Sequence, residues 1–161
     1  MFELSAPLSV RLAQEDDKPF FKQLYATTRD DLKNLPVSPQ ELVEVIEMQQ
    51  VVQENGLRDV YPGAKQWTIL LDEEKIGRLI VDYNGSDWRV IDIAIMPQRR
   101  NQGWGRQVLQ AVMTHAGNLD NSVSLAVFGV NPGARRLYER LNFKVTRSDR
   151  VHAQMIWRKA A

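Results

Sequence analysis

The most constraining feature of the sequence is a central block of three successive segments with the pattern of β-strands. The segments cover residues 67–71, 76–83 and 88–96, and short polar stretches at 72–74 and 84–87 separate them. Period-two alternation and a high content of Val and Ile are typical of strands, and connections this short join antiparallel neighbours. The block therefore predicts the centre of a mostly antiparallel sheet.

Further helices and strands are predicted on both sides of this block. Strands are expected at residues 8–12, at 122–128 and between Phe143 and Trp157, and helical spacing of apolar residues occurs at 20–25, 42–51, 104–117 and 132–141. Ser38, Pro39 and Glu41 are a start signal for the second helix, and Asn55-Gly56 predicts its end. The order of elements predicts one α/β domain over residues 1–161.

The amino-acid composition excludes several kinds of functional site. The chain has 0 Cys, so disulfides, thiolate metal sites and cysteine nucleophiles are excluded, and no metal site is predicted. The first residues lack the pattern of a signal peptide, and no apolar run approaches membrane-spanning length. We therefore expect a cytoplasmic protein without a membrane partner.

Charge is divided unevenly along the chain. Residues 1–56 hold 5 Lys/Arg against 10 Asp/Glu, residues 57–96 hold 5 against 7, and residues 97–161 hold 11 against 3. A basic segment can indicate nucleic-acid binding. Here, however, the basic residues are interleaved with a glycine loop and a patterned helix. This arrangement favours a small polyphosphate ligand, and we expect no nucleic-acid partner.

A glycine-containing loop joins the strand that ends at Pro97 to the next helix. It reads Arg100-Asn101-Gln102-Gly103-Trp104-Gly105-Arg106. A helix N-terminus presents free N–H groups, glycines let an anion approach closely, and arginines add charge, so the loop suits a phosphate or pyrophosphate. The same glycines can also simply turn the chain, so the loop by itself leaves both interpretations open.

Two common phosphate-binding motifs do not match this loop. A P-loop requires Lys and then Ser or Thr after its last glycine, where this chain has Arg106 and Gln107. A dinucleotide-binding loop requires a third glycine or alanine at the position of Val108. The loop therefore belongs to neither class.

The run from Ile93 to Gly105 resembles the GNAT superfamily of N-acetyltransferases. The family's pattern of a strand followed by a proline, an arginine and two glycines is matched in order and spacing by Pro97, Arg100, Gly103 and Gly105. Asn101 stands where many members have a glycine, and Trp104 stands where a smaller aliphatic residue is common. The order of elements also resembles the family over most of the chain. The resemblance implies an α/β (α+β) GNAT fold, with a mixed, mostly antiparallel central sheet that is flanked by helices and splayed at the coenzyme A site. It also implies acetyl-CoA as cosubstrate.

The resemblance also implies which residues hold acetyl-CoA. The backbone of Ile93, Ala94 and Ile95 would pair with the pantetheine amides, and one N–H of this strand would act as the oxyanion donor. The remaining cofactor-binding residues implied by the loop are Arg100, Asn101, Gln102, Gly103, Trp104, Gly105 and Arg106.

A second stretch, from Asn131 to Phe143, resembles another conserved part of the family. There Asn131 would help to hold the CoA arm, and Tyr138 would contact CoA and protonate its departing thiolate. Asn142 follows the helix where a left-handed cap is wanted, and asparagine suits that conformation. The alternative is that Tyr138 is an ordinary tyrosine at the edge of the core.

The sequence says less about the residues that would bind or deprotonate the amine acceptor. Asp92 is the acidic residue nearest the cofactor strand and is a candidate general base, as is His152, whereas His115 is interpreted as structural. Asp30 and Asp31 lie in the acidic N-terminal third, which favours a cationic acceptor or is simply a solvated acidic surface.

These residues predict direct transfer of an acetyl group from acetyl-CoA to an amine of a small molecule or a protein. The alternative is a non-catalytic sensor or regulatory module that binds acyl-CoA. The sequence leaves homodimerisation open.

Overall fold

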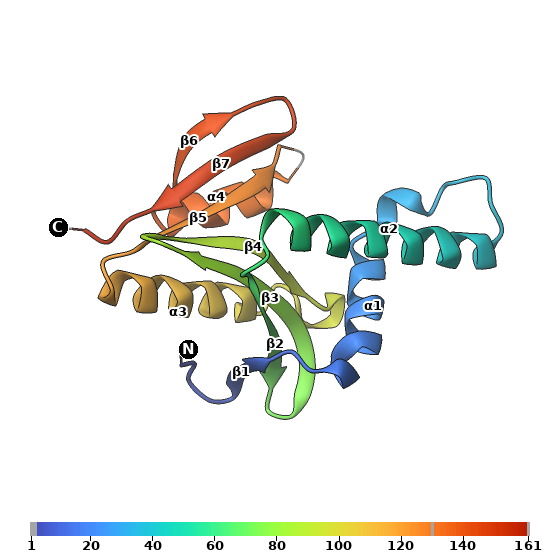
Figure 1. Ribbon diagram of the computed structural model, residues 1–161, viewed down its shortest axis with the longest axis horizontal. Coiled ribbons are helices and arrows are strands. Elements are labelled where there is room, and N and C mark those ends of the chain that lie inside the picture. Colours follow the sequence, from blue (N-terminus) through green and yellow to red (C-terminus); the bar gives the residue numbers. More distant parts are fainter. Residues whose placement is uncertain (1–2, 130, 161) are drawn as a thin grey trace.

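A seven-stranded sheet forms the centre of the protein, and the computed structural model describes residues 3–129 and 131–160. Its strands are β1 (Leu8–Leu12), β2 (Lys65–Leu71), β3 (Glu74–Asn84), β4 (Asp87–Ile95), β5 (Ser122–Phe128), β6 (Lys144–Ser148) and β7 (His152–Trp157). The strand order is β1-β2-β3-β4-β5-β7-β6, and among the described residues only the β4–β5 pair is parallel (Figure 1). The predicted mixed, mostly antiparallel sheet is confirmed.

The α-helices that flank the sheet are α1 (Lys18–Thr27), α2 (Pro39–Val60), α3 (Trp104–Asn118) and α4 (Pro132–Arg140). Short 3-10 segments cover Glu15–Asp17, Asp30–Leu32 and Pro97–Arg99. Each α-helix and strand predicted from the sequence occurs, with limits that differ by a few residues. Within the described ranges, none of the helices combines the length and the hydropathy needed to span a membrane.

Helix α2 begins where predicted but ends later. The Glu41 N–H donates to Ser38 Oγ at 3.1 Å, so Ser38 is the N-cap. The predicted end at Asn55-Gly56 is wrong, because the helix continues to Val60. A glycine inside a helix costs only about 1 kcal/mol, and Leu57 continues the half-buried side of α2. Pro62, two residues beyond the end, is the stronger stop.

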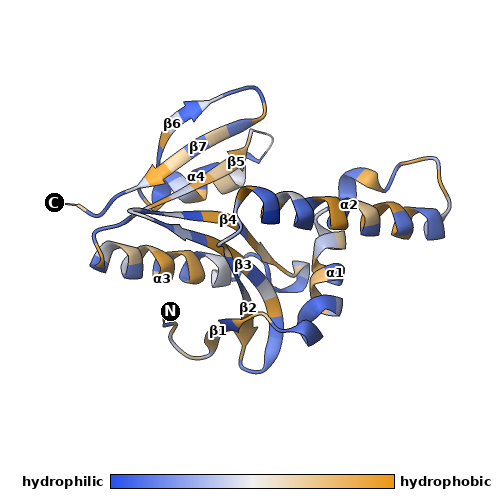
Figure 2. Cartoon of the chain, in the orientation of Figure 1, coloured by the Kyte–Doolittle hydropathy of each residue, from blue (hydrophilic) through white to orange (hydrophobic). Residues whose placement is uncertain are grey.

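The two faces of the sheet carry different layers. On one face, strand residues such as Trp67, Ile69 and Leu79 join α3 residues such as Val108 and Val112 in the main core. On the other face, residues of α1 and the start of the loop after β4 form a second cluster of Phe21, Leu24 and Met96. Helix α2 has no buried residue, and its N-terminal half projects beyond the sheet with hydrophobic and hydrophilic residues side by side (Figures 1 and 2).

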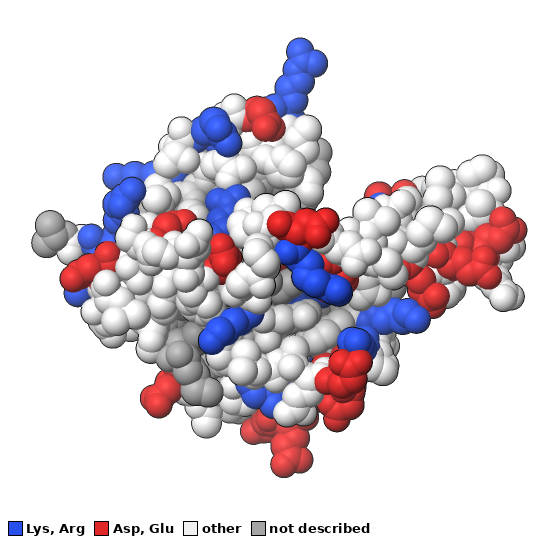
Figure 3. All heavy atoms as spheres, viewed as in Figure 1, with Lys and Arg blue, Asp and Glu red and all other residues white. Residues whose placement is uncertain are grey.

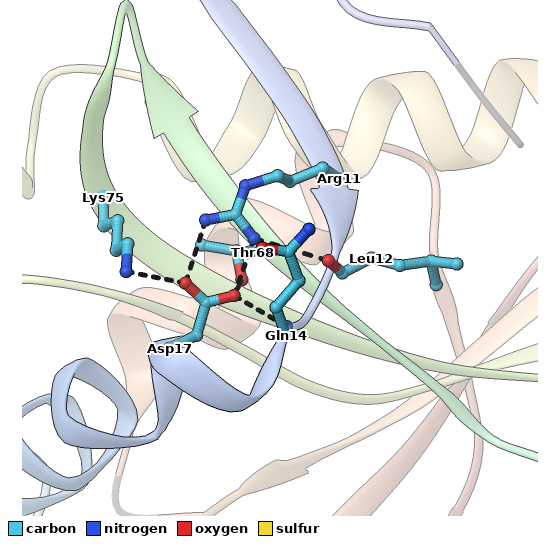
Figure 4. Close-up of polar contacts among 6 residues, drawn as sticks. All are labelled: Arg11, Leu12, Gln14, Asp17, Thr68 and Lys75. Atoms are coloured by element: carbon cyan, nitrogen blue, oxygen red, sulfur yellow. Dashed lines mark hydrogen bonds and ion pairs between the residues drawn. The ribbon is translucent and has the colours of Figure 1, made fainter.

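The start of α1 is fixed to the sheet by the carboxylate of Asp17, whose exposed fraction is 0% (Figure 4). Arg11 of β1 donates to both carboxylate oxygens, at 2.7 and 2.9 Å. Lys75 of β3 lies 2.7 Å from Oδ1, and the Thr68 hydroxyl of β2 donates to Oδ2 at 2.9 Å. The Gln14 N–H donates to the same oxygen at 2.8 Å. One buried carboxylate thus joins α1 to three neighbouring strands.

Candidate active site

The sheet opens between β4 and β5. The two strands pair in parallel only from Asp87 to Arg89 and from Ser122 to Ser124. From Val90 to Ile95, β4 is paired with β3 but has no ladder partner on its other side among the described residues. The splayed sheet that the resemblance implied is therefore present.

The register of β3 and β4 turns part of the backbone of β4 toward this opening. The Met96 N–H donates to the Ile76 carbonyl at 2.8 Å, so these two residues form a hydrogen-bonded antiparallel pair. Hydrogen-bonded and non-hydrogen-bonded pairs alternate along such a ladder. Ile95 and Ile93 therefore direct their N–H and C=O groups away from β3, whereas Ala94, between them, bonds to β3.

The glycine loop leads directly into α3. Gly103 is its N-cap with a φ of 84°, and Asn101 has a φ of 61°. Asparagine tolerates this left-handed conformation better than most residues, which explains how it replaces a glycine here. The first helical bond runs from the Gln107 N–H to the Gly103 carbonyl at 3.0 Å. The N–H groups of residues 104–106 thus have no acceptor within the described part of the chain and are free for an anion.

The side chains of the loop are held close to it. Arg100 donates from Nε to the Ile95 carbonyl at 2.8 Å and from Nη2 to Thr27 Oγ1 at 3.3 Å, which ties the loop to the ends of β4 and α1. The Trp104 indole N–H donates to Gln102 Oε1 at 2.9 Å. Gly105 is half-buried against Ile95, and Arg106 is exposed. The Arg100 guanidinium therefore lies between the loop and the opening of the sheet, with two of its donors already bonded.

Helix α4 borders the other side of the opening. Asn131 is its N-cap, and its Oδ1 accepts a hydrogen bond from the Ala134 N–H at 3.1 Å. Asn142 follows the helix with a φ of 70°, which confirms the predicted left-handed cap. Asn131 thus sets the direction of α4.

Tyr138 lies on α4, half-buried and packed against the main core, with its ring centroid 5.9 Å from that of Phe143. Its hydroxyl has no hydrogen-bond partner within the described residues. Burial raises the pKa of Tyr138, and the negative charge of Asp92 raises it further. The phenol of Tyr138 therefore stays protonated at neutral pH.

Asp92 is paired with a buried arginine that the sequence did not single out. Arg78 of β3, 3% exposed, donates to Asp92 Oδ2 from Nη2 at 2.8 Å and from Nε at 3.2 Å. It also donates from Nη1 to Glu54 Oε1 of α2 at 2.9 Å. Nothing in the local pattern marks Arg78, because a single arginine in a strand usually faces solvent.

The other sequence candidates lie apart from this cluster. His152 begins β7, and its ring lies 4.6 Å from that of Phe128, the last residue of β5. His115 stacks on Trp88 at 5.5 Å, in keeping with the predicted structural role. Within residues 3–129 and 131–160, no cluster of His, Cys, Asp or Glu has the arrangement of a metal site.

The carboxylates of Asp30 and Asp31 are each paired with a neighbouring cation. Lys33 Nζ lies 3.0 Å from Asp30 Oδ1, and Arg29 Nε lies 3.1 Å from Asp31 Oδ1. All four side chains are on the surface or close to it. This pairing favours the interpretation of the acidic segment as a solvated surface.

The left-handed conformation at Gly103 gives a direct test of the loop. Gly103→Ala should raise the Kd for acetyl-CoA roughly tenfold, because a Cβ strains this backbone by about 1–2 kcal/mol. An added Cβ would meet no atom within 4 Å, so crowding does not contribute. Gly56→Ala in α2 is the control, since Gly56 also has open space but no positive φ. Titration calorimetry should show an unchanged Kd for that control, and an unchanged Kd for Gly103→Ala would contradict the assignment of the loop.

Three solved acetyltransferase structures illustrate what the fold is similar to. The PaiA N-acetyltransferase of Thermoplasma acidophilum, solved with coenzyme A, has a TM-score of 0.70 at 13% identity and covers 94% of this chain and 99% of its own. The spermidine N-acetyltransferase of Vibrio cholerae, solved with CoA and spermine, has a TM-score of 0.66 at 16% identity, with 96% of each chain covered.

The third is the acetyl transferase of Salmonella typhimurium that modifies the N-terminal serine of a ribosomal subunit protein. Its TM-score is 0.66 at 18% identity, with 97% of each chain covered. No curated protein sequence matches significantly. At these identities the structures establish the fold.

The sequence itself matches the model of the acetyltransferase (GNAT) family over residues 23–143, which is most of the chain. The match includes β4, the glycine loop, α3 and α4, and it confirms the family resemblance and the predicted enzyme class. The chain belongs to the GNAT family of acetyltransferases.

Proposed function

We propose that the protein transfers the acetyl group of acetyl-CoA directly to a primary amine. The observation that carries this proposal is the opening between β4 and β5, where the Ile93 and Ile95 N–H groups and the Ile93 carbonyl have no strand partner among the described residues, while the Ile95 carbonyl accepts from Arg100. The free N–H groups at the start of α3 and the hydroxyl of Tyr138 support the same assignment. Pantetheine is an extended diamide, so it suits an unpaired strand edge. Its pyrophosphate suits the start of α3.

The reaction then needs few groups from the protein. The amine nitrogen bonds to the carbonyl carbon of the thioester, the carbon–sulfur bond breaks, and the sulfur leaves with the bonding electrons. A backbone N–H of β4 stabilises the negative charge on the carbonyl oxygen. The Tyr138 phenol gives its proton to the departing sulfur and regains one from solvent.

Asp92 is our candidate for the acceptor side of the reaction. Arg78 occupies Oδ2 of this carboxylate, whereas Oδ1 has no partner within the described residues. Oδ1 is therefore the atom that can hold the acceptor's ammonium group or take its proton, directly or through a water molecule. Arg78 positions the carboxylate.

The absence of cysteine permits a simple assay. A thiol reagent added to the protein, acetyl-CoA and an amine reports only the CoA that is released, because the chain has 0 Cys. We expect turnover with at least one of a panel that includes a polyamine, an aminoglycoside, a lysine-containing peptide and free amino acids. Tight acetyl-CoA binding without turnover on any amine would support a non-catalytic sensor instead.

A further inference from the structure

A second cavity lies on the α1–α2 face of the sheet, away from the glycine loop. Its volume is about 610 Å³, within the range of small-molecule sites. Its wall is formed by the first half of α1, the second half of α2, and strands β2 and β3. The lining residues that matter here are Lys18, Lys22, Arg58, Phe21, Leu57 and Ile80.

The walls of this cavity are fixed by two buried ion networks. Asp17 anchors the start of α1 to β1, β2 and β3, immediately before Lys18. Glu54 anchors α2 to β3 through Arg78, whose guanidinium also lies 5.7 Å from the centre of the Phe21 ring. Because both walls are held in this way, the cavity has its shape before a ligand binds. Binding then costs less conformational entropy, which favours affinity.

The lining combines cations with an apolar floor. Lys18, Lys22 and Arg58 are the basic lining residues, and Glu54 is the acidic one. Glu54 already accepts a hydrogen bond from Arg78. Lys and Arg side chains gather around the junction of α1 with the second half of α2 (Figure 3). The cavity therefore suits an anionic group attached to an apolar body.

All three cations are exposed, and two of them form ion pairs with surface glutamates. Lys18 pairs with Glu15 and Lys22 with Glu47, but all four side chains are 45–84% exposed. Surface pairs of this kind contribute about 0–1 kcal/mol, so the lysines exchange partners readily. Arg58 has no ion-pair partner within residues 3–129 and 131–160 and is exposed at the cavity.

The cavity is adjacent to β4, the strand that carries Asp92. Ile80 of its floor is the cross-strand partner of Asp92 on β4. Glu54 of its wall is joined to Asp92 through Arg78. Neighbouring strands lie about 4.8 Å apart, so the backbone of Ile80 at the cavity floor is one strand spacing from that of Asp92.

We propose that the acceptor is an amine that carries a carboxylate, or a similar anion, at the far end of an apolar chain. This inference rests on the proposed acetyl transfer and names the class of its acceptor. The amine lies at Asp92, the chain crosses Ile80 and Phe21, and the anion lies near Arg58 and the two lysines. It replaces the cationic acceptor expected from the acidic N-terminal third.

Three amines of equal length test this assignment. The first, ε-aminocaproate, ends in a carboxylate, hexylamine ends in a methyl group, and hexamethylenediamine ends in a second ammonium. We expect kcat/KM for ε-aminocaproate to exceed that for each of the others by roughly tenfold, since charge-assisted hydrogen bonds discriminate by about that factor. A preference for hexamethylenediamine would overturn the proposal.

Arg58→Glu should invert the preference. The variant should lower kcat/KM for ε-aminocaproate about tenfold or more and raise it for hexamethylenediamine. Arg58→Gln should lower kcat/KM for ε-aminocaproate without raising it for hexamethylenediamine. Lys144→Glu on β6 is the matched control, because Lys144 is exposed and does not line the cavity. Equal effects of Arg58→Glu and Lys144→Glu would mean that only overall charge matters and would refute the site.

A binding measurement separates this inference from the proposed function. Caproate lacks an amine, and calorimetry at millimolar concentration should detect its binding to the wild-type protein but not to Arg58→Glu. If no amine is acetylated, the proposed function fails, while caproate binding that depends on Arg58 still supports the anion site. If hexylamine and ε-aminocaproate are acetylated equally well, the proposed function stands and the anionic acceptor is wrong.

Discussion

Tyr138→Phe is expected to lower kcat roughly a hundredfold or more while the Kd for acetyl-CoA changes by less than about twofold. The substitution removes one hydroxyl that has no hydrogen-bond partner within the described residues, and it keeps the ring that packs beside Phe143. Because the proposed proton transfer to the sulfur takes place only as the carbon–sulfur bond breaks, the loss of the hydroxyl should appear in kcat. Stopped-flow turnover and calorimetric titration with acetyl-CoA measure the two quantities separately.

The environment of Tyr138 also predicts the pH dependence. Burial, and then the charge of Asp92, raise the pKa of Tyr138 above its ordinary value of 10.0. The phenol must be protonated to act as an acid, so wild-type kcat should not fall because of Tyr138 until the pH exceeds this raised pKa. Tyr138→Phe should therefore lower kcat by a similar factor at every pH below it.

Tyr83→Phe is the matched control for this experiment. The Tyr83 hydroxyl also belongs to a half-buried ring, but it accepts a hydrogen bond from the Trp67 indole at 3.0 Å. Its ring packs against Trp88, where β4 is still paired with β5. Its loss should reduce stability slightly and leave kcat unchanged. If Tyr138→Phe instead weakened acetyl-CoA binding strongly with an unchanged kcat, Tyr138 would be a binding residue and not the acid.

Local signals in the sequence predicted much of the fold and of the cofactor side. Ser38 and Glu41 gave the start of α2 because an N-cap is a contact between residues three apart. Asn142 adopts the positive φ that was expected of it as the cap of α4, and Asn101, which also replaces a glycine, has a positive φ as well. Such features depend on neighbours in the chain, so a sequence pattern can reveal them.

Long-range contacts could not be predicted in the same way. Arg78 meets Asp92 and Glu54 from two other elements, and neither the spacing nor the residue types identify the three as one cluster. The cavity lined by Lys22 and Arg58 likewise depends on how α1 and α2 cross the sheet. The net charge of the N-terminal third therefore suggested a cationic acceptor, whereas the individual side chains at the cavity favour an anionic one.

The carboxylate of Asp17 should be among the most important side chains for stability. Asp17→Asn should lower the free energy of unfolding by about 3 kcal/mol at pH 7, because it leaves Arg11 and Lys75 without their buried partner. For a domain of this size that corresponds to a fall in Tm of roughly 10 °C. Urea denaturation monitored by tryptophan fluorescence measures the difference. Asp16→Asn, which neutralises the adjacent exposed carboxylate, should change stability by less than about 0.5 kcal/mol.

The pH dependence of this difference distinguishes a charge effect from a packing effect. Hydrogen bonds from Arg11, and then from Lys75, hold the pKa of Asp17 far below its ordinary value of 3.8, against the opposing effect of burial. A carboxylate with a lowered folded-state pKa stabilises the protein fully above its unfolded-state pKa, and this contribution is lost as the pH falls toward the folded-state value. The gap between wild type and Asp17→Asn should therefore be constant from about pH 5 to pH 7 and narrow below about pH 4. A gap that stayed constant down to pH 3 would mean that Asp17 acts through its shape and hydrogen bonds alone, and not through its charge.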